Sequence, residues 1–276
     1  MLLRLHRVRI PLIAIAMVVL LGDLLLGLVY GGARDLRSLL VLAALLVGLA
    51  AFVALVVGNR SAPVAPQRTV RAPVRGTWRA LNSPATKVPS HGVRGYGQAY
   101  AIDLVHEPEP GARPAFGGAA FRAADRYPAF GEQVTAMIDG EVVDVSDRHR
   151  DHRARSSLAS LTYLMVEAAV RELGGPGFIV GNHVTIRGDD GVFALVAHLQ
   201  RGSVVVRPGE RVRAGEPIGR CGNSGNSSEP HVHAQLMDRA SLWTAQGVPM
   251  AYAGITLGES SEAADALPAN DEVMHA

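Results

Sequence analysis

Cysteine and lysine are nearly missing from this chain of 276 residues. Cys221 is the only cysteine, so the chain can form no intrachain disulfide and no cysteine-rich metal site. Lys87 is the only lysine, so almost all of the 27 basic side chains are arginine, and 25 acidic side chains nearly balance them. The resulting net charge of +2 is too small to indicate nucleic-acid binding. We therefore expect no nucleic-acid partner.

Charged residues are also scarce in two stretches near the N-terminus. Residues 10–30 are apolar except for Asp23, and residues 39–58 contain no charge. Each stretch has about the 20 residues that a helix needs to cross the hydrocarbon core of a bilayer. We expect residues 1–58 to form a membrane hairpin of two transmembrane helices in the lipid bilayer, with residues 31–38 as the polar connection. A charge is unfavourable against lipid, so Asp23 is expected to lie against the second helix or near an interface.

A cleaved signal peptide is the alternative for the first stretch, because Arg4, Arg7 and Arg9 form a basic leader. The second apolar stretch and the lack of a clear small-x-small cleavage site favour anchoring.

The remaining residues divide into a linker, a domain and a tail. Residues 59–75 are rich in Pro and Arg and predict an extended linker. Residues 76–257 contain short strand-like runs separated by Gly, Pro, Asn and Asp, which predicts a mainly β domain. Leu158, Leu161 and Met165 recur at helical spacing, so we expect a helical insertion over residues 157–173. The acidic tail at 258–276 has few large apolar residues and is predicted to be disordered.

The most informative motif is Pro230-His231-Val232-His233. It follows a loop-like run of Gly, Asn and Ser at 222–229 and leads into a strand-like run. Side chains two apart on a strand point the same way, so His231 and His233 would share one face. One imidazole can bind a catalytic metal while the other hydrogen-bonds the water or substrate beside it. A pair of surface histidines on an edge strand would give the same pattern, so the motif needs support from the rest of the chain.

Three other residues supply that support. Asp103 interrupts an apolar run at 100–104, and a buried carboxylate needs a partner. His91 precedes it in a Ser-His-Gly segment, and His198 ends another apolar strand. A catalytic zinc keeps three protein ligands and leaves one position open, which these residues could provide. The sequence contains no His-Glu-x-x-His motif, so a histidine would have to act as the base.

Four segments together resemble the lysostaphin-type (LytM-like) zinc metalloendopeptidases: residues 97–104, 197–199, 206–215 and 219–236. The resemblance extends from about residue 76 to residue 250 and leaves out the membrane hairpin. It implies a lysostaphin-type β-sheet core of duplicated hybrid motifs and a Zn²⁺ ion held by His91, Asp103 and His233. His198 and His231 then correspond to the two family histidines that assist the attacking water. The implied activity is hydrolysis of peptide bonds in the stem peptides or cross-bridges of bacterial peptidoglycan.

The chain departs from the family pattern at the first ligand. Many members place this ligand four residues before the Asp, where this chain has Ala99. His91 is the nearest preceding histidine, and the family includes members with a longer interval of this kind. Gln98 is the alternative, although an amide is a poor zinc ligand beside imidazole. The other histidines of the domain are expected to lie in loops or to pack in strands: His106, His149, His152 and His183.

Two other functions compete with the peptidase. The first is a catalytically inactive wall-binding or hydrolase-regulating module on the same fold. Some members of the family that the chain resembles lose metal ligands, whereas this chain keeps all five candidate residues. A lipoyl- or biotinyl-type carrier has a turn like residues 206–215 but needs a modifiable lysine in a hairpin. Lys87 is far from any such context.

The arginines around the hairpin bear on its orientation. More of them flank the hairpin than lie in its connection; the flanking ones are Arg4, Arg7, Arg9, Arg60, Arg68, Arg71 and Arg75, and the connecting ones are Arg34 and Arg37. Read literally, this distribution keeps the large domain in the cytoplasm. The rule weakens for long translocated domains, and a peptidoglycan substrate requires the opposite side. We expect a cell-membrane protein with an extracytoplasmic catalytic domain.

Overall fold

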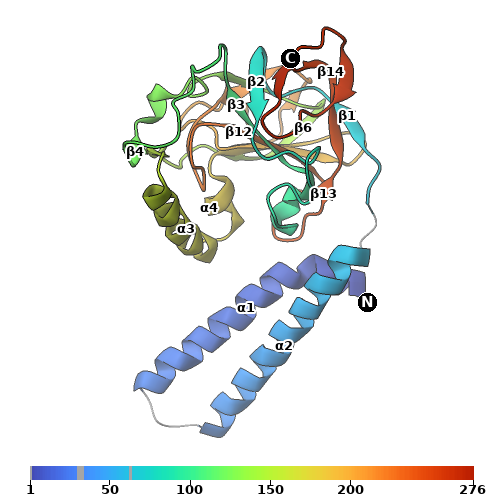
Figure 1. Ribbon diagram of the computed structural model, residues 1–276. Helices are drawn as coiled ribbons and strands as arrows, with labels where there is room; N and C mark the ends of the chain where they lie inside the picture. Colours follow the sequence, from blue (N-terminus) through green and yellow to red (C-terminus); the bar gives the residue numbers. More distant parts are fainter. Residues whose placement is uncertain (1, 30–33, 62–63) are drawn as a thin grey trace. The chain divides into compact units, whose positions relative to one another are not determined.

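The computed structural model describes residues 2–29, 34–61 and 64–276, and the chain divides into two compact units at residues 64 and 65. The first unit is a pair of packed helices, α1 (Leu2–Val29) and α2 (Arg34–Ser61) (Figure 1). Both contain a segment long and apolar enough to cross a membrane, Val8–Gly27 and Arg37–Ala54. Arg37 of α2 donates to the Asp23 carboxylate of α1 at 2.8 Å, as expected of an acid that lies against the second helix.

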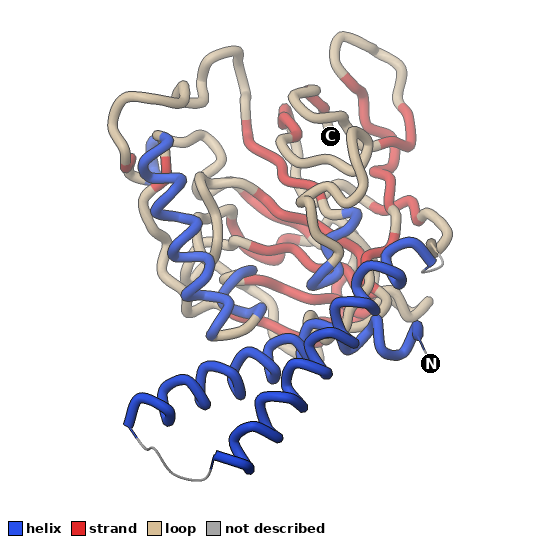
Figure 2. Tube along the Cα trace, turned by 60° about the horizontal axis from the view of Figure 1, so that its bottom comes forward, coloured by secondary structure: helices blue, strands red, loops and turns tan. Residues whose placement is uncertain are grey.

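The second unit is built on one large, mostly antiparallel sheet, whose strands are red in Figure 2. The strand order is β1-β14-β16-β2-β3-β12-β9-β8-β6-β10. Two further strands pair at its side, β13 with β12 and β15 with β14. The bounds are β1 Arg68–Val70, β2 Thr77–Ala80, β3 Ile102–His106, β6 Gly140–Ser146, β8 His183–Arg187, β9 Phe193–Ala197, β10 Arg211–Val212, β12 Val232–Met237, β13 Gly247–Val248, β14 Met250–Leu257, β15 Ala264–Ala266 and β16 Val273–His275.

Smaller elements surround this sheet. Two short pairs lie outside it, β5 (Gln133–Thr135) with β11 (Pro217–Arg220) and β4 (Phe121–Arg122) with β7 (Ala154–Arg155). The helical elements are η1 (Gly95–Tyr100), η2 (Ala124–Arg126), α3 (Leu158–Leu173) and α4 (Pro176–Val180). The mainly β fold expected from the sequence is confirmed, and α3 occupies the segment expected to be a helical insertion.

Strand alternation divides the central strands into a core face and a second face. Ile102 and Leu104 on β3, and Val232, Ala234 and Leu236 on β12, belong to the main hydrophobic cluster. Side chains alternate along a strand, so the residues between them point to the opposite face. The second face is also buried, because every residue of β12 is buried. Polar side chains on this face therefore have to find partners there.

The prediction of a disordered tail at 258–276 is wrong. β15 pairs with β14, and β16 pairs with both β14 and β2. Met274 is fully buried in the main hydrophobic cluster. In the sheet, β16 lies between β14 and β2. The acidic composition misled the prediction because backbone pairing and one well-placed apolar side chain hold this segment.

Candidate metal centre

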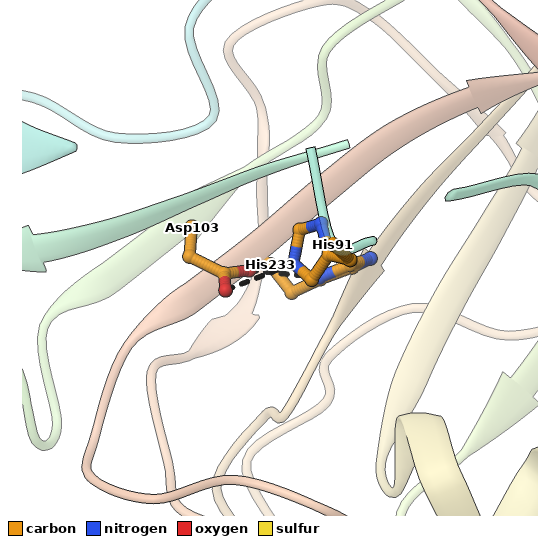
Figure 3. A group of neighbouring side chains, drawn as sticks. All are labelled: His91, Asp103 and His233. Atoms are coloured by element: carbon orange, nitrogen blue, oxygen red, sulfur yellow. Dashed lines mark hydrogen bonds and ion pairs between the residues drawn. The ribbon is translucent and has the colours of Figure 1, made fainter. Parts of the chain in front are cut away.

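Asp103 and His233 face each other on neighbouring strands. β3 and β12 pair antiparallel, and these two residues are direct partners in the register. The His233 Nδ1 atom lies 2.8 Å from the Asp103 Oδ1 atom, although the residues are 130 positions apart in the chain (Figure 3). Both point to the face opposite the core, so the sheet itself sets their separation.

His91 reaches the same carboxylate from the loop before η1. Its Nε2 atom lies 2.9 Å from the Asp103 Oδ2 atom. The chain turns back sharply between them, because Tyr96 and Gly97 have positive φ angles of 57° and 76°. This turn explains how a histidine twelve positions before Asp103 arrives beside it. One ligand atom each from His91, Asp103 and His233 lie within 4.8 Å of one another.

The outer nitrogens of both histidines are held by hydrogen bonds that fix the tautomer. The Ser90 hydroxyl donates to the Ala101 carbonyl at 2.6 Å, so it accepts from His91 Nδ1–H at 2.9 Å. Gln235 donates its amide to the Tyr96 carbonyl at 2.8 Å, which leaves its oxygen to accept from His233 Nε2–H at 2.9 Å. The inner nitrogens of both rings therefore present lone pairs to Asp103. Such an arrangement needs positive charge between the three side chains, from protons or from a metal ion.

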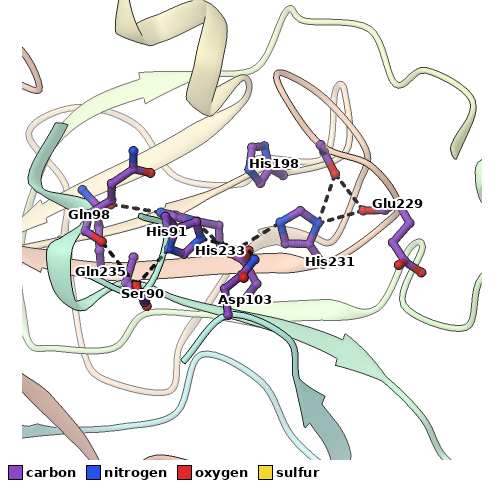
Figure 4. Close-up of polar contacts among 12 residues, drawn as sticks. Ser90, His91, Gln98, Asp103, His198, Glu229, His231, His233 and Gln235 are labelled. Atoms are coloured by element: carbon purple, nitrogen blue, oxygen red, sulfur yellow. Dashed lines mark hydrogen bonds and ion pairs between the residues drawn. The ribbon is translucent and has the colours of Figure 1, made fainter. Parts of the chain in front are cut away.

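His198 and His231 lie at the other side of the cluster (Figure 4). His198 follows β9 directly and has a φ of 61°, an uncommon conformation that clusters at functional sites. Its Nδ1–H donates to the Ser224 carbonyl at 2.8 Å, and its ring centre is 4.7 Å from that of His231. His231 donates from Nδ1 to the Glu229 carbonyl at 2.8 Å, and its Nε2 lies 3.5 Å from Asp103 Oδ1. The structure thus brings all five predicted residues into one cluster.

The electrostatics of the cluster favour an ionised Asp103 and a neutral His198. Burial alone would raise the pKa of Asp103, but when the surrounding rings are protonated, the charges of His91 and His231, with hydrogen bonds from His231 and His233, outweigh burial and hold the pKa well below its usual range. Burial, followed by the charges of His231 and His233, lowers the pKa of His198 well below its usual range. A neutral imidazole beside an anionic ligand can accept a proton.

Sequence reasoning missed the residues that support the cluster. Ser90 and Gln235 orient the two inner histidines, and Asn82 donates from Nδ2 to Asp103 Oδ2 at 2.8 Å. Gln235 had a readable signal, because it stands two positions after His233 on the same strand face. The other two come from loops, whose position depends on the tertiary fold.

The remaining histidines of the domain have other partners. His106 stacks on Trp78 with ring centres 4.9 Å apart, and His149 packs edge-on to Phe178. His152 Nε2 lies 2.9 Å from the Gly225 carbonyl. His183 is buried, with its Nε2 3.2 Å from the Asp144 carboxylate.

Part of the domain matches a family of known proteins. Residues 122–244 match the model of "Peptidase family M23". The matched interval contains His198, His231 and His233, whereas His91 and Asp103 precede it. The chain therefore contains a segment that matches peptidase family M23, and two helices that are apolar enough to span a membrane precede it. The match supports a metallopeptidase-type hydrolase.

Several solved structures are similar to parts of the chain. The catalytic domain of lysostaphin from Staphylococcus simulans is 18% identical, with 63% of this chain and 88% of that chain covered and a TM-score of 0.32. A variant catalytic domain of the prophage-encoded M23 protein EnpA from Enterococcus faecalis is 22% identical over 50% of this chain and 81% of that chain, with a TM-score of 0.30. A putative glycyl-glycine endopeptidase lytM from Ruminococcus gnavus is 15% identical over 72% and 63%, with a TM-score of 0.34. At these scores the assignment stands on the family match and the residues of the cluster.

Proposed function

We propose that this protein is a zinc-dependent endopeptidase that hydrolyses peptide bonds in peptidoglycan stem peptides or cross-bridges. The observation that carries the proposal is the convergence of His91, Asp103 and His233 on one point, with His198 and His231 beside it. The peptidase M23 match supports the reaction class, and the resemblance of the motifs to lysostaphin-type enzymes supports the substrate class.

The three inner side chains fit a catalytic zinc site. Two imidazole nitrogens and one carboxylate oxygen form a typical set of three protein ligands, with the fourth position left for water or substrate. Bonds of about 2.0–2.2 Å to a tetrahedral ion are compatible with ligand atoms that lie within 4.8 Å of one another. The lone pairs of His91 Nε2 and His233 Nδ1 point at the Asp103 carboxylate. A divalent cation between the three groups would accept both lone pairs and balance the negative charge of the carboxylate. When bound, zinc would polarise the scissile carbonyl and lower the pKa of its water.

The chain's own contribution to proton transfer comes from His198 and His231. Each donates its Nδ1–H to a backbone carbonyl, Ser224 or Glu229, so Nε2 is the nitrogen of each ring that can exchange a proton. In His231 this nitrogen lies 3.5 Å from the Asp103 Oδ1 atom. Either histidine can take the proton of the attacking water and return it to the leaving amine. Once protonated, the ring also donates a hydrogen bond to the developing oxyanion.

Purified full-length protein in detergent provides the test. Zinc content and cleavage of muropeptides are measured for the wild type and for His233→Ala, Asp103→Ala and His231→Ala. The first two variants are expected to lose both zinc and cleavage. His231→Ala is expected to keep zinc and to lose about 10²–10⁴-fold in rate, the usual contribution of a general acid or base.

His149→Ala is the matched control, because His149 is a partly buried histidine outside the cluster, and it is expected to keep both zinc and activity. Full cleavage by His231→Ala and His233→Ala would remove the mechanism. A wild-type protein that binds peptidoglycan without zinc and without cleavage would instead be a wall-binding or regulatory module.

We further propose that the catalytic domain lies outside the cytoplasm, where the peptidoglycan is. Protease added to intact cells lacking the wall is expected to digest the domain. Protection until the cells are lysed would mean that the arginine distribution predicts the orientation correctly, and it would deny the domain any contact with its substrate.

A further inference from the structure

The helix α3 places Glu167 and Arg171 inward and most of its large apolar side chains outward. Glu167 lies on the side of the helix that faces the domain. Its carboxylate forms ion pairs with Arg155 at 2.5 Å and with Arg171 at 3.3 Å. Arg155 belongs to β7 and has a side chain that is only 4% exposed. A helix on the surface of a soluble domain normally has the reverse pattern, with apolar residues inward.

The outward face of α3 is mainly apolar, although Thr162 and Glu172 are exposed as well. Six of its large side chains are at least half exposed to solvent: Leu158, Tyr163, Met165, Val166, Val170 and Leu173, with Leu158, Met165 and Leu173 at 76%, 74% and 81%. Within α3, all of which is described, the charged residues are Glu167, Arg171 and Glu172. The first two form the inward ion pairs, and Glu172 accepts from the Tyr96 hydroxyl. A contiguous exposed apolar face of this kind marks a surface that something covers.

A basic loop borders this face. The His149 ring contacts the Phe178 ring on α4, which follows α3, and Phe178 is itself half exposed. The same loop carries three exposed arginines, Arg148, Arg150 and Arg153. Its acids are turned toward backbone amides instead: Asp147 accepts from Gly202, and Asp151 accepts from Arg201 and Asn223. The outward charge of the loop is therefore positive.

We propose that the outward face of α3, with the basic loop beside it, docks on the surface of an anionic lipid bilayer. An apolar helix face enters the boundary between headgroups and acyl chains, and neighbouring arginines bind the phosphates. The short connection between α2 and β1 supports a bilayer as the occupant of this face. Only residues 62–67 separate the end of α2 at Ser61 from the start of β1 at Arg68, and that segment spans at most about 25 Å when fully extended. If the two helices span a membrane, a domain on so short a connection is confined near the bilayer surface. The proposal does not depend on the proposed peptidase activity.

The test uses full-length protein reconstituted into vesicles of phosphatidylcholine and phosphatidylglycerol. A fluorophore is attached at Met165→Cys, and its quenching by a nitroxide on the lipid acyl chain is measured. The native Cys221 is fully buried and does not compete for the label. Ser261→Cys is the matched control, because Ser261 is an exposed residue in the β14–β15 connection, which Figures 1 and 2 draw at the opposite side of the β domain from α3.

Docking predicts severalfold stronger lipid quenching at residue 165 than at residue 261. Adding Val166→Glu on the same face is expected to bring the two signals together, and so is replacing Arg148, Arg150 and Arg153 by serine. Equal quenching at the two labelled positions in the otherwise wild-type protein would overturn the proposal. A label at residue 165 that is shielded from an aqueous quencher but untouched by the lipid quencher would also overturn it, because a second copy or another protein would then cover the face.

Discussion

His233 and Asp103 are paired directly across β12 and β3, with their Nδ1 and Oδ1 atoms 2.8 Å apart. The ladder of backbone hydrogen bonds on both sides holds these two side chains in place. His91, in contrast, arrives from a loop whose position depends on the turn at Tyr96 and Gly97. The cluster thus combines two rigidly held side chains with one that the η1 turn positions.

Ser90→Ala is expected to weaken metal binding without removing a ligand. The Ser90 hydroxyl accepts from His91 Nδ1–H, and loss of such an orienting partner typically costs 10–100-fold in metal affinity. Titration of the full-length protein with zinc against a chelator measures the effect. Ser156→Ala is the matched control: Ser156 is also buried and donates to the Ala119 carbonyl, outside the cluster. Equal zinc affinity in the two variants would contradict an orienting role for Ser90.

Gly97→Ala is expected to lower the stability of the β domain. Gly97 has a φ of 76°, and an added Cβ would lie 2.8 Å from Met237 Cγ. The left-handed conformation costs about 1–2 kcal/mol for a residue with a Cβ, and the clash adds about 1–3 kcal/mol. Gly191→Ala separates the two effects, because Gly191 has a φ of 79° with nothing within 4 Å of the added atom. Thermal unfolding of the full-length protein should show the larger loss for Gly97→Ala, and similar losses would mean that Met237 moves aside.

Asp144→Asn is expected to lower stability at neutral pH but not in acid. The hydrogen bond from His183 is the main cause that lowers the pKa of Asp144 from its ordinary value. A folded-state pKa below the unfolded value stabilises the protein above about pH 3.9, and this stabilisation is lost as the pH falls through the folded value. Because the Asp144 side chain is largely exposed, the effect is at most about 1 kcal/mol. Unfolding free energies of both proteins, measured with chelator present, should differ at pH 7 and converge in acid; a gap that widens in acid would contradict this sign.

The thiol of Cys221 is expected to be inert in the native protein. Cys221 is fully buried, and burial raises the pKa of the thiol well above its ordinary value. The reactive thiolate is therefore both scarce and inaccessible. An aromatic disulfide reagent at pH 8 should react only after denaturant is added. Rapid reaction of the native protein would mean that the loop around residue 221 opens readily.

Several features could be predicted because they depend on local sequence. The two uncharged stretches predict the long apolar helices, and the alternation in β12 predicts that His231 and His233 share a face. The spacing of apolar residues predicts α3, since helical periodicity is visible in one segment of chain. The same periodicity did not reveal that the apolar face of α3 points outward, because the pattern alone does not say which side the rest of the domain covers.

The sequence by itself determined the residue types of the site: four histidines, one carboxylate and no cysteine cluster. Only the tertiary structure decided that His91 meets Asp103, that Ser90 and Gln235 hold the outer nitrogens, and that the C-terminal residues pair as strands. The physical reason is the same in each case. These contacts join segments far apart in the chain, and their geometry is fixed by sheet register and by the η1 turn, neither of which a local pattern contains.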